Sequence, residues 1–118
     1  MTITEIKELL DAELLTTGGD TDTQILSACG SDMMSDVLAY VKNRAVLLTG
    51  LVNPQVIRTA HMMDMVAIVF VRNKKPTAEM IALAEQSNMM ILSTPKRMYE
   101  ACGVLYVNGL KGDGELNG

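Results

Sequence analysis

The sequence predicts an α/β fold, a three-layer or two-layer sandwich in which crossover helices cover a largely parallel sheet of four to five strands. Short apolar runs alternate with amphipathic segments along most of the chain, which is the pattern of repeated strand–helix units. Each of the three prolines, Pro54, Pro76 and Pro95, stands where an apolar run gives way to an amphipathic run. Proline is favoured in the first turn of a helix, so each proline marks a predicted helix start.

The first elements are expected in residues 2–43. Thr2 and Glu5 have the spacing of a capping box, so a helix is expected to open the chain. A short strand is then expected over 12–16, followed by a turn built on two adjacent glycines and an extended run over 25–30. A helix should follow Ser31 and Asp32 and run to about Asn43.

Three strands are predicted over 45–49, 65–71 and 89–92. Nearly every residue in these runs is apolar, as expected for parallel strands that are buried on both faces of a sheet. Asn53 and Thr94 directly precede two of the prolines and are typical N-cap residues, which predicts helices from 54 and from 95. Another helix is expected from Pro76 to about Ser87.

The domain organisation is expected to be simple, because 118 residues make one domain. The last helix carries an apolar stripe and is expected to end near Gly109; the stripe consists of Met98, Ala101, Cys102 and Leu105. We therefore predict a single domain over residues 1–109 and a flexible C-terminal tail over 110–118, which is polar and rich in glycine.

The composition argues against nucleic acid and membranes as partners. The net charge is −4, and only 3% of residues are aromatic, whereas nucleic-acid-binding domains show a basic face or aromatic stacking platforms. The most basic run contains Arg72, Lys74 and Lys75, and is expected to be a solvated loop. No apolar run approaches the length of a membrane span, and no signal sequence is expected at the N-terminus.

Cys29 and Cys102 are the two cysteines, and both have apolar neighbours in the sequence. We expect them to be reduced, buried side chains of a cytoplasmic protein. They form no CxxC pair, and the chain has one histidine, so no metal site is predicted. No phosphate-binding or dinucleotide-binding loop occurs either, so no cofactor is expected.

The most plausible ligand site lies at the carboxyl ends of the predicted strands, where open α/β sheets bind their ligands. The residues there are polar, and the candidate ligand-binding residues are Ser31, Asp32, Thr49, Gly50, Asn53, Arg72, Ser93 and Thr94, with Lys74 as an additional cation. Such a site favours a small anionic ligand, because helix N-termini attract anions. The alternative is that these residues only cap helices.

His61 is a weak candidate for catalysis. Asp64 follows three residues later and could pair with it along a helix, but a catalytic histidine also needs a nucleophile within reach. Adjacent methionines cannot all face a core, so Met33 and Met62 are expected to be exposed or to lie at an interface. Because methionine is enriched at protein contacts, this favours a homodimer.

The order of segments resembles the DRTGG domain family, an α/β module similar to the N-terminal domain of HPr kinase/phosphorylase. The resemblance covers about residues 2–107 and rests on the phrases TITEIKELLDAELLT, GSDMMSDVLAYV, VLLTGLVNPQVIRTA, VAIVFVRNKKP and MMILST. It implies a regulatory or accessory module with no catalysis of its own. Family members occur beside nucleotide-sensing CBS domains or phosphate acetyltransferase domains and tend to form dimers.

Three functions follow from the residues and the resemblance. The first is a non-catalytic regulatory homodimer that acts on a partner protein in trans. The second is a sensor that binds a nucleotide or a phosphorylated metabolite at the strand ends. The third and weakest is a small enzyme that uses His61.

Overall fold

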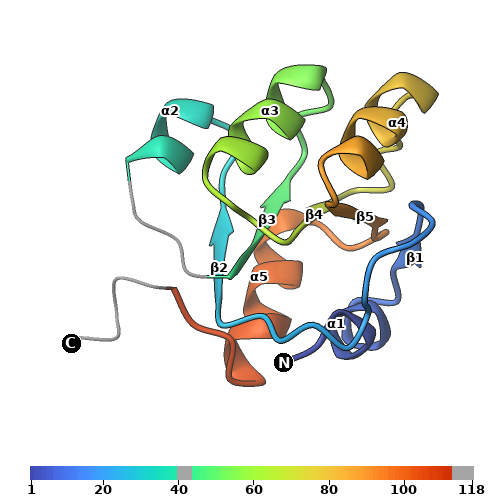
Figure 1. Ribbon diagram of the computed structural model, residues 1–118. Helices are drawn as coiled ribbons and strands as arrows, with labels where there is room; N and C mark the ends of the chain where they lie inside the picture. The colour runs from blue at the N-terminus through green and yellow to red at the C-terminus, as the bar shows by residue number, and fades with distance from the viewer. Residues whose placement is uncertain (40–43, 113–118) are drawn as a thin grey trace.

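The computed structural model describes residues 1–39 and 44–112 (Figure 1). The helices are α1 (Ile3–Leu9), α2 (Met34–Leu38), α3 (Pro54–Met62), α4 (Ala78–Gln86) and α5 (Met98–Val107). The strands are β1 (Glu13–Leu14), β2 (Ser27–Gly30), β3 (Ala45–Thr49), β4 (Ala67–Phe70) and β5 (Met90–Ser93).

The strands form one five-stranded sheet in the order β1-β5-β4-β3-β2. The strands β2 to β5 are parallel, and β1 is antiparallel to β5, with Leu14 opposite Leu92. This confirms the predicted α/β class with a largely parallel sheet. Every residue of β3, β4 and β5 is buried, which explains why these three strands could be recognised as continuous apolar runs.

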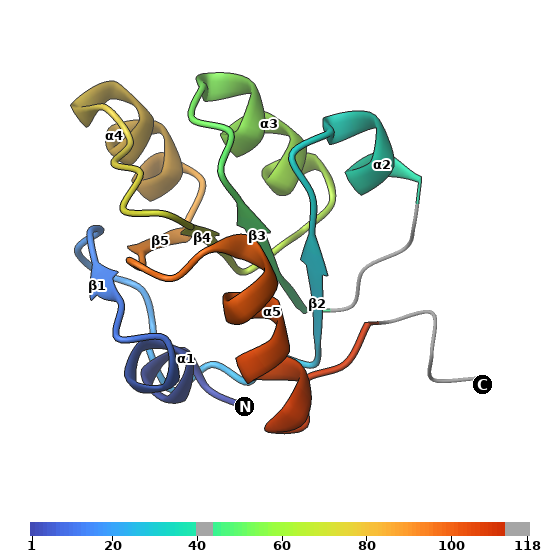
Figure 2. The same ribbon diagram turned by 180° about the vertical axis from the view of Figure 1, so that it is seen from behind.

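The molecule has three layers. Helices α2, α3 and α4 lie on one face of the sheet, and α1 and α5 lie on the other (Figures 1 and 2). Because β2 to β5 follow one another across the sheet in chain order, crossovers of one hand place all three connecting helices on the same face. The segment after β5 instead passes to the opposite face.

The sheet separates two hydrophobic cores, since successive side chains of a strand point to opposite faces. The core under α1 and α5 contains Ile6, Val46, Leu48, Val69, Leu92 and Leu105. The core under α2, α3 and α4 contains Leu47, Ile57, Ile68, Phe70, Met80 and Ile91. A full shell of apolar contacts on both faces makes the parallel strands the rigid centre of the fold.

Not every proline is the first residue of a helix, although the sequence had indicated that each one is. Pro54 is the first residue of α3, and Asn53 caps that helix, because Val56 N donates to Asn53 Oδ1 at 3.3 Å. Pro76 instead precedes the N-cap of α4, which is Thr77.

The prediction that Thr94 caps a helix is wrong. Helix α5 begins at Met98, and its N-cap is Arg97. The chain needs residues 94–97 to pass from the sheet to its opposite face, and residues before proline favour extended backbone. The Thr94 hydroxyl donates instead to Leu10 O at 2.6 Å.

Several boundaries also differ from expectation. The strand expected over 12–16 is reduced to the two residues of β1, and α2 ends at Leu38. The part of the predicted helix over 40–43 lies outside the described residues. Leu110 is buried and Lys111 O accepts a hydrogen bond from Ala28 N at 3.0 Å, so packing continues past Gly109. Of the predicted tail, residues 113–118 lie outside the described chain.

The cap of α3 gives a first prediction. Asn53→Ala removes the side-chain acceptor for Val56 N and should lower the free energy of unfolding by about 1 kcal/mol. Urea denaturation followed by circular dichroism measures this loss. Asn53→Asp keeps an acceptor and should retain most of the stability, so equal losses in both variants would contradict a capping role.

Candidate functional site

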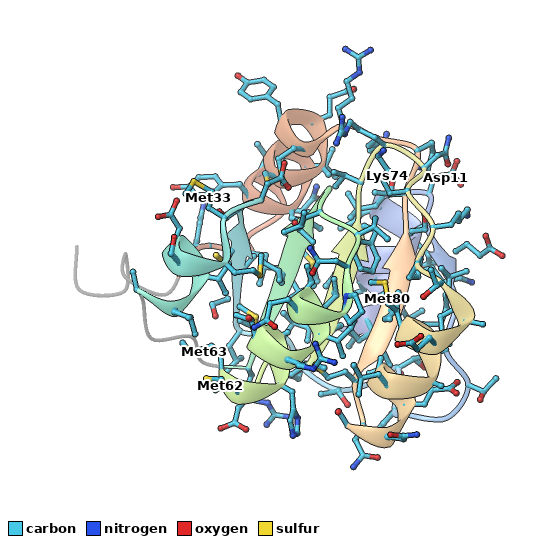
Figure 3. All side chains as sticks on the ribbon, turned by 90° about the horizontal axis from the view of Figure 1, so that it is seen from above. Asp11, Met33, Met62, Met63, Lys74 and Met80 are labelled. Atoms are coloured by element: carbon cyan, nitrogen blue, oxygen red, sulfur yellow. The ribbon has the colours of Figure 1, made fainter. Side chains whose placement is uncertain are left out.

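The parallel strands bring the predicted ligand residues to one edge of the sheet, where their carboxyl ends meet. In Figure 3 this edge lies toward the top of the picture, where Met33, which follows β2, and Lys74, which follows β4, are on the same side of the molecule. The hydrogen bonds of the predicted residues decide which of them could still bind a ligand, because a polar group already satisfied by the protein has little left to offer.

Asp32 organises the loop after β3. Its Oδ1 atom accepts hydrogen bonds from Thr49 Oγ1 at 3.0 Å and from Gly50 N at 2.7 Å. Thr49 Oγ1 in turn accepts from Leu51 N at 3.1 Å, and the Thr49 side chain is fully buried. The Asp32 carboxylate therefore ties the ends of two neighbouring strands together and makes their shared corner negative.

Ser31 and Asn53 serve their own segments. Ser31 Oγ accepts from Met33 N at 3.0 Å, which stabilises the turn into α2. Asn53 caps α3. The capping interpretation therefore agrees with the contacts of Asn53, whereas Ser31 stabilises the turn before α2, whose N-cap is Met33 and has no side-chain cap hydrogen bond.

Ser93 and Thr94 are buried at the end of β5 and join distant segments. Ser93 Oγ donates to Lys74 O at 2.8 Å, and so fixes the loop after β4. Thr94 Oγ1 donates to Leu10 O and accepts from Lys96 N at 3.2 Å. Both hydroxyl groups thus hold the architecture of this edge, which leaves them poorly placed to bind a ligand.

Arg72 differs from the other predicted residues, because its charged group is exposed at the edge. Its guanidinium lies over Gly50, where Nη2 is 2.7 Å from the position that a β-carbon would occupy. Glycine is therefore required at position 50 for this placement. Arg72 has no ion-pair partner among the described residues.

Sequence reasoning missed two features. The first is the pair Lys96 and Arg97, which follows β5 and lies against the loop that contains Arg72, because Arg72 N donates to Lys96 O at 2.8 Å. The signal was the basic pair directly after Pro95. The second is the outer face of α5, where Tyr99 and Val107 are exposed. The sequence indicated this face through a predicted helix that has apolar residues on every side.

His61 lies exposed on α3, and it lines neither the cavity between β2 and α5 nor the depression on the outer face of α5. The contacts of the described residues therefore give no support to catalysis by His61 with Asp64. Within residues 1–39 and 44–112, no three histidine, cysteine or carboxylate side chains are close enough together to hold a metal ion. No helix in that part of the chain has the length and apolar character needed to cross a bilayer.

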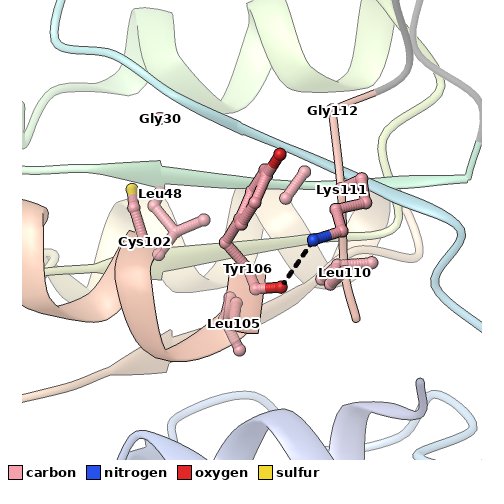
Figure 4. A pocket seen from close by; sticks show the side chains of 9 residues that line it. Gly30, Leu48, Cys102, Leu105, Tyr106, Leu110, Lys111 and Gly112 are labelled. Atoms are coloured by element: carbon pink, nitrogen blue, oxygen red, sulfur yellow. Dashed lines mark hydrogen bonds between the residues drawn. The ribbon is translucent and has the colours of Figure 1, made fainter. Parts of the chain in front are cut away.

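A cavity of about 200 Å³ lies between β2 and α5 (Figure 4). Gly30, Leu48 and Cys102 line one part of it, and residues 110–112 close it. Lys111 Nζ donates to Tyr106 O at 3.2 Å and lies 3.6 Å from the centroid of the Tyr106 ring. The volume is below that of ordinary small-molecule sites, and none of the predicted ligand residues lines the cavity.

Both cysteines are free thiols and are partly buried, where full burial was expected. The Cys102 sulfur packs against Gly30 and lies 3.7 Å from the Met98 sulfur. Burial raises the pKa of the Cys102 thiol, and the nearby Cys29 thiol raises it further. A raised pKa lowers the fraction of reactive thiolate, so these contacts favour a packing role for Cys102.

The buried hydroxyl of Thr94 gives a second prediction. Thr94→Val keeps the shape of the side chain but leaves Leu10 O and Lys96 N without their partner, which should lower the free energy of unfolding by about 1–3 kcal/mol. Thermal and urea denaturation would measure it. Thr94→Ser retains the hydroxyl and serves as the control; a Thr94→Val variant as stable as the parent chain would contradict a structural role.

Comparisons with known proteins place this fold. No family model and no curated protein matches the chain. Among solved structures, the chain is similar to the CBS and DRTGG domains of the regulatory region of Clostridium perfringens pyrophosphatase, complexed with the activator diadenosine tetraphosphate. The TM-score is 0.73 at 14% identity, and the match covers 88% of this chain and 45% of that one. The chain thus spans less than half of that structure, and the likeness supports the expected DRTGG-like fold.

Proposed function

We propose that this chain is a non-catalytic regulatory module that acts as a homodimer, and that the outer face of α5 forms the dimer interface. A partner protein in trans would receive the regulatory signal, since the described residues contain no assembled catalytic group. The fold of a pyrophosphatase regulatory region supports the regulatory role. Two free thiols fit the expected cytoplasmic location.

The observation that carries the dimer is the character of α5. Glu100 is its only charged residue, although the helix lies on the surface. Ala101 and Leu105 are buried against the sheet, while Tyr99 is 91% and Val107 is 80% exposed on the outside. A helix that is apolar on all sides is normally buried on all sides, so its outer face is expected to be covered in the functional state.

The outer face also has a shape that suits a second copy of itself. It carries a mostly apolar, shallow depression of about 560 Å³, lined by Tyr99, Glu100, Cys102, Gly103, Val104, Tyr106 and Val107. Gly103 lies at its centre, four residues after Tyr99 and four before Val107, and a β-carbon at position 103 would meet nothing within 4 Å. Glycine inside a helix costs about 0.5–1 kcal/mol, and this cost is offset if Gly103 lets another backbone approach closely.

A two-fold axis through Gly103 would pair two α5 helices in antiparallel order. Tyr99 of each copy would then lie near Val107 of the other, which is the self-complementary arrangement of a two-fold interface. The antiparallel order also brings opposite ends of the two helix dipoles together. Aromatic side chains are enriched in such interfaces, as Tyr99 and Tyr106 would be here.

The methionines that indicated a dimer from the sequence offer a weaker interface. Met33 and Met62 are 61% and 68% exposed, as expected. Figure 3 shows, however, that they lie at opposite ends of the α2 and α3 layer. Separate exposed apolar side chains are normal on protein surfaces, so the continuous face of α5 is the better candidate.

The dimer gives a third prediction, in which stability and assembly change in opposite directions. Gly103→Gln introduces a better helix former, worth up to about 1 kcal/mol to the isolated helix, and fills the proposed crossing point. We expect the parent chain to have twice the mass of one 12.8 kDa chain by light scattering. The variant should have the mass of one chain while circular dichroism shows that it remains folded.

Met62→Gln is the matched control, because it places the same side chain on another exposed apolar position. It should leave the mass unchanged. A parent chain of 12.8 kDa at all concentrations, or a Gly103→Gln variant that remains dimeric, would contradict this interface.

A second candidate function is a sensor for a small anionic ligand at the strand ends. The exposed guanidinium of Arg72 beside Lys96 and Arg97 favours it. The other predicted ligand residues support it less, because Asp32, Thr49, Ser93 and Thr94 are engaged within the protein. Such a sensor and the dimer are compatible, since the ligand edge and the middle of α5 are separate.

A further inference from the structure

Basic residues are concentrated in two loops, after β4 and after β5. The chain has ten lysines and arginines and a net charge of −4. Half of the ten lie in residues 72–75 and 96–97, which we call the basic loops; they are Arg72, Lys74, Lys75, Lys96 and Arg97. The rest of the chain is therefore strongly acidic, and the basic loops form its main positive region.

Backbone hydrogen bonds hold the basic loops together. Arg72 N donates to Lys96 O at 2.8 Å, and Asn73 N donates to Thr94 O at 2.9 Å. The Ser93 hydroxyl adds a third link through Lys74 O at 2.8 Å. Because neighbouring strands are about 4.8 Å apart, these bonds bring together the backbone positions that carry the basic side chains of the two loops.

Most of these charges have no ion-pair partner among residues 1–39 and 44–112. Lys75 forms an ion pair with Glu13 at 2.9 Å, but no ion pair involves Arg72, Lys74, Lys96 or Arg97 within the described residues. Clustered like charges repel one another, and a bound anion would relieve that repulsion.

The backbone of the first loop is strained in a way that creates this arrangement. Arg72 and Asn73 have φ values of 59° and 57°, and two consecutive residues with side chains rarely adopt this left-handed conformation. The conformation lets both amides reach the loop after β5. Strain of this kind is concentrated at functional sites.

The basic loops also lie at a topological switch point of the sheet, where the connections after two adjacent strands lead to opposite faces. The segment after β4 leads to α4 on one face, and the segment after β5 leads to α5 on the other face (Figures 1 and 2). Ligands of open α/β sheets bind in the crevice at such a point. Arg97 supplies no side-chain cap to α5, so the amides of its first turn add to the positive potential.

We infer that the basic loops bind a small ligand through a chain of two or three phosphates, with Arg72, Lys74, Lys96 and Arg97 as the cations. The inference rests on the sensor function proposed above and moves its site from the cap residues to the β4–β5 edge. A short phosphate chain fits better than a nucleic acid polymer, because the remaining cations lie on other elements. Those described are Lys7, Arg44, Arg58 and Lys111.

Isothermal titration of the full chain with inorganic tripolyphosphate, pyrophosphate and orthophosphate tests this site. We expect tripolyphosphate to bind more tightly than orthophosphate, and its affinity to fall with added salt.

Lys74→Gln with Lys96→Gln should weaken tripolyphosphate binding by about tenfold or more. Gly50→Ala displaces the Arg72 guanidinium and should weaken binding without removing a charge.

Lys7→Gln with Arg58→Gln is the matched control, because it lowers the net charge equally at exposed positions on α1 and α3. This variant should bind tripolyphosphate like the parent chain. The inference is wrong if the parent binds neither polyphosphate, if both double variants are weakened equally, or if a short oligonucleotide binds more tightly than tripolyphosphate. Light scattering on the same samples reports the dimer separately, so loss of binding in a sample of unchanged mass counts against this site alone.

Discussion

The passage of the chain from one face of the sheet to the other after β5 is the constraint on which the other features depend. Three successive crossovers place α2, α3 and α4 on one face and leave the opposite face of β3, β4 and β5 uncovered. Helices α1 and α5 bury that surface; α5 reaches it only because the chain switches sides after β5, and it contributes Ala101 and Leu105. The Thr94 hydroxyl, bonded to Leu10 O, fixes the point of departure.

This crossing also accounts for the two surfaces proposed to function, which are the basic loops and the outer face of α5. It places the start of α5 beside the loop after β4, where the cations gather. It also presents the far side of α5 to solvent, since no further element follows in the described chain to cover it. A ligand at the beginning of α5 and a second copy along its length would therefore act on the same helix, which offers a direct physical route from binding to assembly.

The sequence predicted the features that depend on local pattern. Buried parallel strands appear as apolar runs, and Asn53 before Pro54 marked a helix start correctly. Thr94 before Pro95 has the same local pattern, but its hydroxyl bonds to Leu10, which is remote in the sequence. No local rule separates a cap from such a tertiary contact. Lys96 and Arg97 become candidate ligand-binding residues only because the loop after β4 lies against them. Gly103 becomes a candidate contact between two copies only once the structure shows which side of α5 is buried.

The contact between Lys111 O and Ala28 N has a consequence for solubility. Strand β2 forms one border of the sheet, and a border strand with unpaired backbone groups invites strands from other molecules to add to it. Residues 110–112 lie beside that border and occupy the Ala28 amide. The opposite border is β1, which has two residues and is too short to serve as a template. Both borders of the sheet thus offer a poor template for an added strand, which favours helical surfaces for the association of copies of this chain in a defined number.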